Sequence, residues 1–179
     1  AEGYNYLGLI ALAQRKLDEA IEHFRKTIEL GRKRFPLRIS KKRYWSDHVP
    51  VPGQQFEYGF DDIGNRTTAK AGGDSNGGSL RSATYTANGL NQYTSRSVPG
   101  GMDVLGLANS AASVTVNGSA ADYRRGEYFQ EAVSVSNGSG AVFAGVNVIA
   151  SNGGSSTTNT GNVFVPQTPE TPTHDADGN

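Results

Sequence analysis

The chain has 179 residues, a formal net charge of zero at pH 7 and no cysteine. A neutral chain has no overall field that would draw in nucleic acid or a membrane surface, so we expect neither as a partner. Without cysteine there are no disulfides and no thiolate chemistry, and no apolar run reaches the roughly 20 residues that span a bilayer. The 23 glycines favour turn-rich β structure or partial disorder.

Residues 1–30 have the periodicity of two amphipathic helices. Apolar residues recur at intervals of three and four on two faces, with the polar break Gln14-Arg15-Lys16 between them. The pattern predicts antiparallel helices over residues 3–14 and 17–30, ended by Gly31. An amphipathic helical hairpin of no particular family fits these observations.

The same stretch, residues 1–31, resembles a tetratricopeptide repeat (TPR). The positions that carry the resemblance are Leu7, Gly8, Ala11, Ala20, Phe24 and Thr27. Gly8 and Ala20 are small enough to let the two helices approach closely, whereas Tyr4 stands where the family usually has tryptophan. The resemblance implies a protein partner, although one unit cannot bury its own apolar face and about three are needed for stability.

Residues 32–55 are predicted to be a basic linker. Arginines and lysines crowd between Arg32 and Arg43 without an acidic residue, and Tyr44-Trp45 follows. Such a run can bind nucleic acid, but the neutral chain favours a solvated linker. His48 beside Asp47 has no second histidine near it in the sequence, so we predict no metal site.

Residues 56–97 contain two copies of one short pattern, 27 residues apart: YGFDDIGNRT from Tyr58 and YTANGLNQYT from Tyr85. Tyr58 and Phe60 alternate with polar or small residues, which predicts a strand with both aromatics buried on one face. Asp61 can accept backbone hydrogen bonds and Gly64 can take a positive φ, so a hairpin turn should follow.

This pattern resembles the repeat of RHS/YD-repeat proteins, Tyr-x-Phe-Asp-x-x-Gly-Asn-Arg. The second copy departs from it at Ala87 and Asn88, and a third copy begins in residues 173–179, THDADGN. The repeat positions are Tyr58, Phe60, Asp61, Gly64, Asn65, Arg66, Tyr85, Asn88, Asn91, Asp175, Gly178 and Asn179. Unrelated hairpins in a glycine-rich β protein are the alternative.

The RHS/YD resemblance implies a structural role. In that family the hairpins spiral into a large hollow β-cage, which in bacteria often encloses a C-terminal toxic domain. It therefore implies a secreted or cell-surface bacterial protein, a protein partner or self-assembly, and a toxin domain beyond Asn179 in the full-length protein. The chain begins inside a helix pattern and ends inside a repeat, which is expected of a fragment.

Residues 98–165 are predicted to form a small inserted β-sandwich. Six short strand-like runs, the first at residues 113–116, are separated by turn signals such as Asn117-Gly118 and Asn137-Gly138. The stretch is similar to Ig-like modules of bacterial surface and carbohydrate-active proteins. We expect flexible loops or linkers at residues 70–79 and 151–160, and residues 166–179 as a stiff linker and the start of a further repeat.

The predicted fold class is therefore α+β, mostly β, with a TPR-like helical hairpin followed by YD-type hairpins and the inserted sandwich. We expect no catalytic residue, no cofactor and no metal: the adjacent acids Asp61 and Asp62 would point to opposite faces of a strand and could not act together on one bond. Two functions stay open, a structural part of an RHS/YD shell and a TPR-like binding module that recognises a protein or glycan.

Overall fold

The structure is a computed structural model that describes residues 21–26 and 37–175. The chain divides into two compact units, Ala1–Arg38 with Gly59–Asn65, and Ile39–Tyr58 with Arg66–Asn179. Strands make up 57% of the described residues and helix makes up 4%. The described part is therefore a β structure.

The α+β prediction with a helical hairpin is wrong for the described part of the chain. Its helix is the short segment at residues 21–26, which includes the half-buried Phe24, and no helical hairpin is seen there. Leu7, Gly8, Ala11 and Ala20 lie outside the described residues. The prediction also assigned charged and glycine-rich stretches to linkers, and these stretches form strands.

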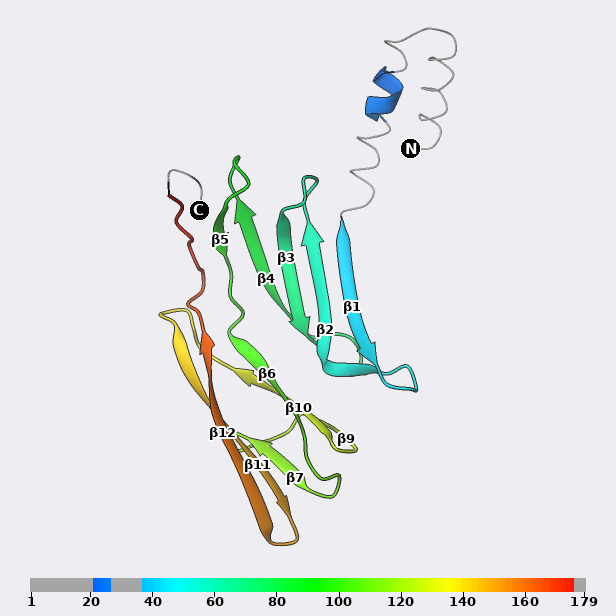
Figure 1. Cartoon of the computed structure of the whole chain (residues 1–179), viewed down its shortest axis with the longest axis vertical. Helices are drawn as coiled ribbons and strands as arrows, with labels where there is room; N and C mark the ends of the chain where they lie inside the picture. The colour runs from blue at the N-terminus through cyan, green and yellow to red at the C-terminus, as the bar shows by residue number, and fades with distance from the viewer. Residues whose placement is uncertain (1–20, 27–36, 176–179) are drawn as a thin grey trace. The chain divides into compact units, whose positions relative to one another are not determined.

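Strands β1 to β5 form one five-stranded sheet in which spatial neighbours follow chain order. We call this sheet the meander, and Figure 1 shows its strands side by side. The strands are β1 (Arg38–Tyr44), β2 (Pro50–Phe60), β3 (Arg66–Gly72), β4 (Leu80–Ala87) and β5 (Tyr93–Arg96). Because each strand pairs with the next along the chain, short turns are enough to connect them.

Two stretches that were predicted to be linker or loop belong to the meander. The basic residues after Leu37 lie in β1, the edge strand of the sheet, where positive charges discourage pairing with another chain. Residues 70–79 are no flexible loop: they contain the end of β3 and a tight turn at Asp74. Composition alone does not separate a charged edge strand from a linker, because both are polar and exposed.

Strands β6 to β12 form what we call the inserted domain. One of its sheets has the order β6-β10-β9, and the other has the order β12-β11-β7-β8. The strands of the first sheet are β6 (Gly101–Leu107), β9 (Tyr123–Arg125) and β10 (Tyr128–Ser134). The strands of the second sheet are β7 (Ser113–Val116), β8 (Ser119–Ala120), β11 (Val142–Asn152) and β12 (Ser155–Val165).

The inserted domain has an apolar core between its sheets. Val114, Val116 and Phe129 are each at most 5% exposed, and Val146 and Val148 of β11 pack against them. These two β11 valines share one face because strand side chains alternate. Phe129 lies opposite Gly106 of β6, where a Cβ would come within 2.5 Å of the phenylalanine ring.

Two-residue turns close the hairpins of the second sheet. Asn117-Gly118, with φ of 50° and 87°, connects β7 to β8 and confirms the predicted turn. Gly153-Gly154, with φ of 57° and 83°, connects β11 to β12, so residues 151–160 are not the expected linker. Phe143 and Phe164 are partners in this hairpin, and both are mostly exposed.

Candidate functional site

Three turns of the meander share one hydrogen-bond pattern, and they begin at Asp61, Asp74 and Asn88. In each turn the N–H of the first residue donates to the carbonyl oxygen four residues on, at 2.9 Å. The Oδ1 of the same residue accepts the N–H groups two and four residues on, at 2.8–3.1 Å. The predicted hydrogen bonds of Asp61 are thus confirmed, and the other two turns repeat them.

A residue with positive φ stands at the fourth position of every one of these turns. It is Gly64 at 95°, Gly77 at 82° and Asn91 at 63°. Glycine takes this conformation without steric cost, and asparagine is among the few other residues that tolerate it. The predicted positive φ of Gly64 is confirmed.

The hydrogen bonds of these turns favour the charged form of the aspartates. The Ser79 hydroxyl and the Gly78 N–H lower the pKa of Asp74. Desolvation raises the pKa of Asp61, but hydrogen bonds from the Asn65 side chain and from the backbone N–H groups of the turn together outweigh it, and the net shift is downward. Asn88 builds the same turn without a charge, so the geometry itself needs only an oxygen acceptor.

The turn at Asp74 lies about half-way between the other two. The turns begin 13 and 14 residues apart, and together these intervals equal the 27-residue spacing of Tyr58 and Tyr85. One repeat therefore contains two strands and two turns of the same construction.

Arg66 of β3 connects side chains at the repeat positions. Its guanidinium carbon lies 4.9 Å from the ring centroid of Tyr58 and 5.8 Å from that of Tyr85. The Arg66 N–H donates to the hydroxyl of Tyr93 at 2.9 Å, and the rings of Tyr85 and Tyr93 are 5.4 Å apart. We call Tyr58, Arg66, Tyr85 and Tyr93 the tyrosine–arginine row; it crosses β2, β3, β4 and β5.

The burial of the repeat aromatics differs from the expectation. Tyr58 and Phe60 lie in β2 as predicted, but both are half-buried and not buried. Tyr93 was not among the predicted repeat positions, although it is the second-last residue of the second copy of the pattern.

The segment after residue 169 lies beside β5. Arg96 and Glu170 form an antiparallel bridge with N–H to carbonyl distances of 2.9 and 2.8 Å, and their side chains form an ion pair. Four residues later the His174 Nε2 lies 3.0 Å from the carbonyl oxygen of Tyr93. Asp175 ends the described part as an exposed residue, and Gly178 and Asn179 lie outside it.

Hydrogen bonds tie together the two chain segments that lead into and out of the inserted domain. The Val98 N–H donates to the Thr168 hydroxyl at 2.9 Å. Asn137, which is 3% exposed, donates from Nδ2 to the carbonyls of Val98 and Pro166 at 3.3 and 2.8 Å. The backbone carbonyl of Asn137 accepts a hydrogen bond from the Thr168 N–H at 3.0 Å. The Asn137-Gly138 dipeptide predicted a turn, and this buried role of the side chain was missed.

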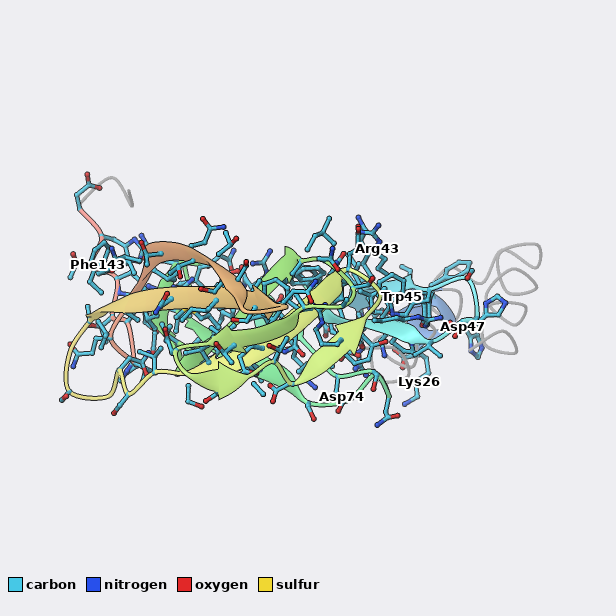
Figure 2. All side chains as sticks on the ribbon, turned by 90° about the horizontal axis from the view of Figure 1, so that it is seen from below. Lys26, Arg43, Trp45, Asp47, Asp74 and Phe143 are labelled. Carbon is cyan, nitrogen blue, oxygen red and sulfur yellow. The ribbon has the colours of Figure 1, made fainter. Side chains whose placement is uncertain are left out.

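An aromatic contact joins the meander to the inserted domain. The Tyr128 hydroxyl donates to the Pro52 carbonyl at 2.6 Å, and its ring packs edge-on against Trp45 at 5.5 Å. Burial raises the pKa of Tyr128. Arg125 covers the Trp45 ring at 5.0 Å and donates two hydrogen bonds to Asp47, at 2.8 and 3.0 Å. Figure 2 shows Trp45 and Asp47 close together.

A second contact between meander and inserted domain is ionic. Asp103 of β6, whose side chain is 9% exposed, pairs with Arg81 of β4 and accepts a hydrogen bond from Gln130 at 3.0 Å. Gly72 makes this possible, because a Cβ there would lie 2.6 Å from the Asp103 carboxylate. Both strand systems thus contribute to one hydrogen-bonded cluster.

The acidic side chains described above act in turns and ion pairs. Asp61 and Asp74 accept the hydrogen bonds of their turns, and Asp47 and Asp103 form ion pairs with arginines. In the described ranges, no three His, Asp or Glu side chains lie close enough to share a metal ion. A groove of about 510 Å³ lies beside Trp45 and Gln54 and offers aromatic and amide groups to a ligand. These acidic side chains stabilise turns and contacts between strands of the described part.

Comparison with known families gives one match. The tetratricopeptide repeat model matches residues 1–33, of which the structure describes residues 21–26. No curated protein and no solved structure matches the chain significantly. Within the described ranges, no helix is both long enough and apolar enough to cross a bilayer.

Proposed function

We propose that the chain is a non-catalytic structural segment of a bacterial RHS/YD-repeat protein, secreted or at the cell surface, and that its hairpins contribute to a β-shell. The observation that carries the proposal is the tyrosine–arginine row, in which residues at repeat positions of successive strands contact one another. Repeat proteins are stabilised by such contacts between neighbouring units.

The recurring turn supports the same proposal. A shell built from hairpins needs a reversal that works at every strand end, and the construction used at Asp61, Asp74 and Asn88 supplies one. The position of Glu170 and His174 beside β5 is what a further repeat strand requires. The inserted domain is then a module carried between two consecutive strands of the shell.

The resemblance also guides the choice of partner. RHS/YD shells often enclose a toxic domain, so we infer that any enzymatic activity of the full-length protein belongs to a domain outside this chain. The segment itself would act through self-assembly and through contacts with the enclosed protein. It would need neither a cofactor nor a metal.

The complete reading frame, expressed and imaged by cryo-electron microscopy, tests the proposal. We expect further Tyr-x-Phe-Asp-x-x-Gly-Asn copies after Asn179 and a hollow β structure in which β5 is followed by the segment around Glu170. A reading frame without further copies, or a meander that stands alone, would contradict the shell.

A binding module is the second candidate, and the tetratricopeptide repeat match over residues 1–33 favours it. In this case residues 1–33 would bind a protein, and the groove beside Trp45 could take a glycan. Crosslinking the chain to its partners in the source cell separates the two candidates. The adaptor predicts crosslinks concentrated in residues 1–33, whereas the shell predicts crosslinks along the meander.

A further inference from the structure

The two sheets of the inserted domain have open edges on the same side. In the described part of the chain, β6 ends one sheet and β12 ends the other. Both strands line one groove of about 730 Å³, to which β6 contributes Leu105 and Leu107 and β12 contributes Thr157 and Asn159. Leu105 and Leu107 are 40% and 74% exposed, so apolar surface lies beside two strand edges.

Strand β12 has none of the features that usually keep an edge strand from pairing. It is eleven residues long, ten of them are exposed, and it contains no charge and no proline. The hairpin partner β11 is also uncharged, as is the whole stretch from Ala132 to Pro169. A long neutral edge of this kind presents a row of backbone donors and acceptors to another strand.

The meander differs from this sheet at both of its edges. Its edge strand β1 carries Arg38, Lys41, Lys42 and Arg43. Its opposite edge, β5, has the bridge between Arg96 and Glu170. One edge is therefore charged and the other has a neighbour, which leaves β12 as the long neutral edge in the part of the chain that the structure describes.

We propose that β12 pairs antiparallel with β12 of a second copy of this chain. The charge pattern favours this occupant: a neutral edge does not select an oppositely charged partner, and two identical neutral edges do not repel each other. A two-fold axis at Thr160 places Thr158 opposite Asn162, and both are exposed polar residues that can hydrogen bond across strands. Pairing in this register continues the four-stranded sheet of each copy into the other.

The groove gives the same interface an apolar part. Because the groove opens beside β12, a second copy joined at this strand brings the two grooves next to each other. Apolar surface of the two grooves, including that of the 74% exposed Leu107, then comes together, which favours association. Isologous pairing of this kind closes as a dimer and leaves no free β12 edge.

Sedimentation velocity over a concentration series tests the dimer, with the full chain as the sample. We expect the wild-type chain to reach twice its monomer mass. The double variant Thr158→Lys/Thr160→Lys places like charges at the axis and should raise the dissociation constant roughly tenfold or more. The matched control is Ser119→Lys/Ala120→Lys, which adds the same charges to exposed residues of β8 at the other edge of the same sheet; it should still dimerise.

Mixing charge variants separates loss of pairing from loss of folding. Thr158→Glu/Thr160→Glu should also be monomeric, and mixing it with the lysine variant should restore the dimer because opposite charges then meet across the axis. A wild-type chain that stays monomeric at its highest soluble concentration overturns the proposal. A dimer that the β12 variants leave unchanged, or that the β8 variants disrupt equally, overturns it too.

Discussion

Arg96 and Glu170 are paired through both of their backbone N–H groups and through their side chains, although the whole inserted domain separates them in the sequence. The chain leaves the meander after β5 and returns beside the same strand. Together with the bonds of Asn137, this pairing anchors the inserted domain at one place on the sheet. A compact module can be carried in this way without breaking the order of the strands.

Replacing Arg66 should weaken the meander. Arg66→Ala removes contacts with the rings of Tyr58 and Tyr85, and we expect a loss of about 1–2 kcal/mol in the free energy of unfolding. Arg66→Lys should retain part of this stabilisation. Urea denaturation of Arg66→Ala, Tyr85→Leu and the double variant measures the coupling. Strictly additive effects of the two substitutions would mean that Arg66 and Tyr85 do not stabilise each other.

Valine at position 64 should strain the first turn. Gly64 has a φ of 95°, and a Cβ there would meet no atom within 4 Å, so the cost comes from the backbone alone. We expect Gly64→Val to cost about 1–2 kcal/mol and Gly64→Asn to cost less, since Asn91 already fills the equivalent position. Hydrogen exchange of the Asn65 amide reports the change. Equal protection in the two variants would argue against the turn geometry.

The turn at Asp74 should lose stability in acid. The pKa of Asp74 is lowered in the folded chain from an ordinary value of 3.8, so its contribution is complete above 3.8 and disappears as the pH falls through the lower folded pKa. Asp74→Asn should keep the turn, as Asn88 does, and remove this part of the acid dependence. Denaturant midpoints between pH 2 and pH 6 would test it. Identical acid profiles for wild type and variant would be inconsistent with the charged turn.

Leucine in place of Asn137 should destabilise the inserted domain. It leaves the carbonyls of Val98 and Pro166 without their donor in a buried site, and we expect a loss of roughly 2–3 kcal/mol. Gln167→Leu is the control, because Gln167 is exposed and its side chain makes a long bond of 3.5 Å to Gly138. Thermal unfolding of both variants gives the comparison. If Gln167→Leu lowered the stability as much as Asn137→Leu, the hydrogen bonds of Asn137 would not be the cause of the loss.

The hairpin turns were predictable where the sequence placed an aspartate or asparagine three residues before a glycine or asparagine. Asp61 with Gly64 and Asn88 with Asn91 were found in this way. Asp74 with Gly77 has the same spacing, but the surrounding glycines resembled a flexible linker and concealed it. Searching for the spacing, and not for composition, would have found all three turns.

The contacts between distant segments could not be predicted. Nothing in the local sequence of Asn137 distinguishes it from Asn117, since both precede glycine and both indicate a turn. Only the folded chain brings Val98 and Pro166 to the Asn137 side chain. Likewise, the charges of β1 indicated a linker because an edge strand and a linker both expose polar residues to water.

Disulfide trapping tests most directly whether the chain returns to its own sheet after the inserted domain. The chain has no cysteine, so within one molecule the cysteines introduced by Arg96→Cys and Glu170→Cys can pair only with each other. Directly opposed residues of antiparallel strands have Cα atoms about 5.5 Å apart, which is within the range of a disulfide. The matched control pairs Arg96→Cys with Thr173→Cys, three residues further along the returning segment. We expect rapid intramolecular oxidation of the 96/170 pair and little of the 96/173 pair. Absence of the 96/170 disulfide, or equal oxidation of both pairs, would contradict it.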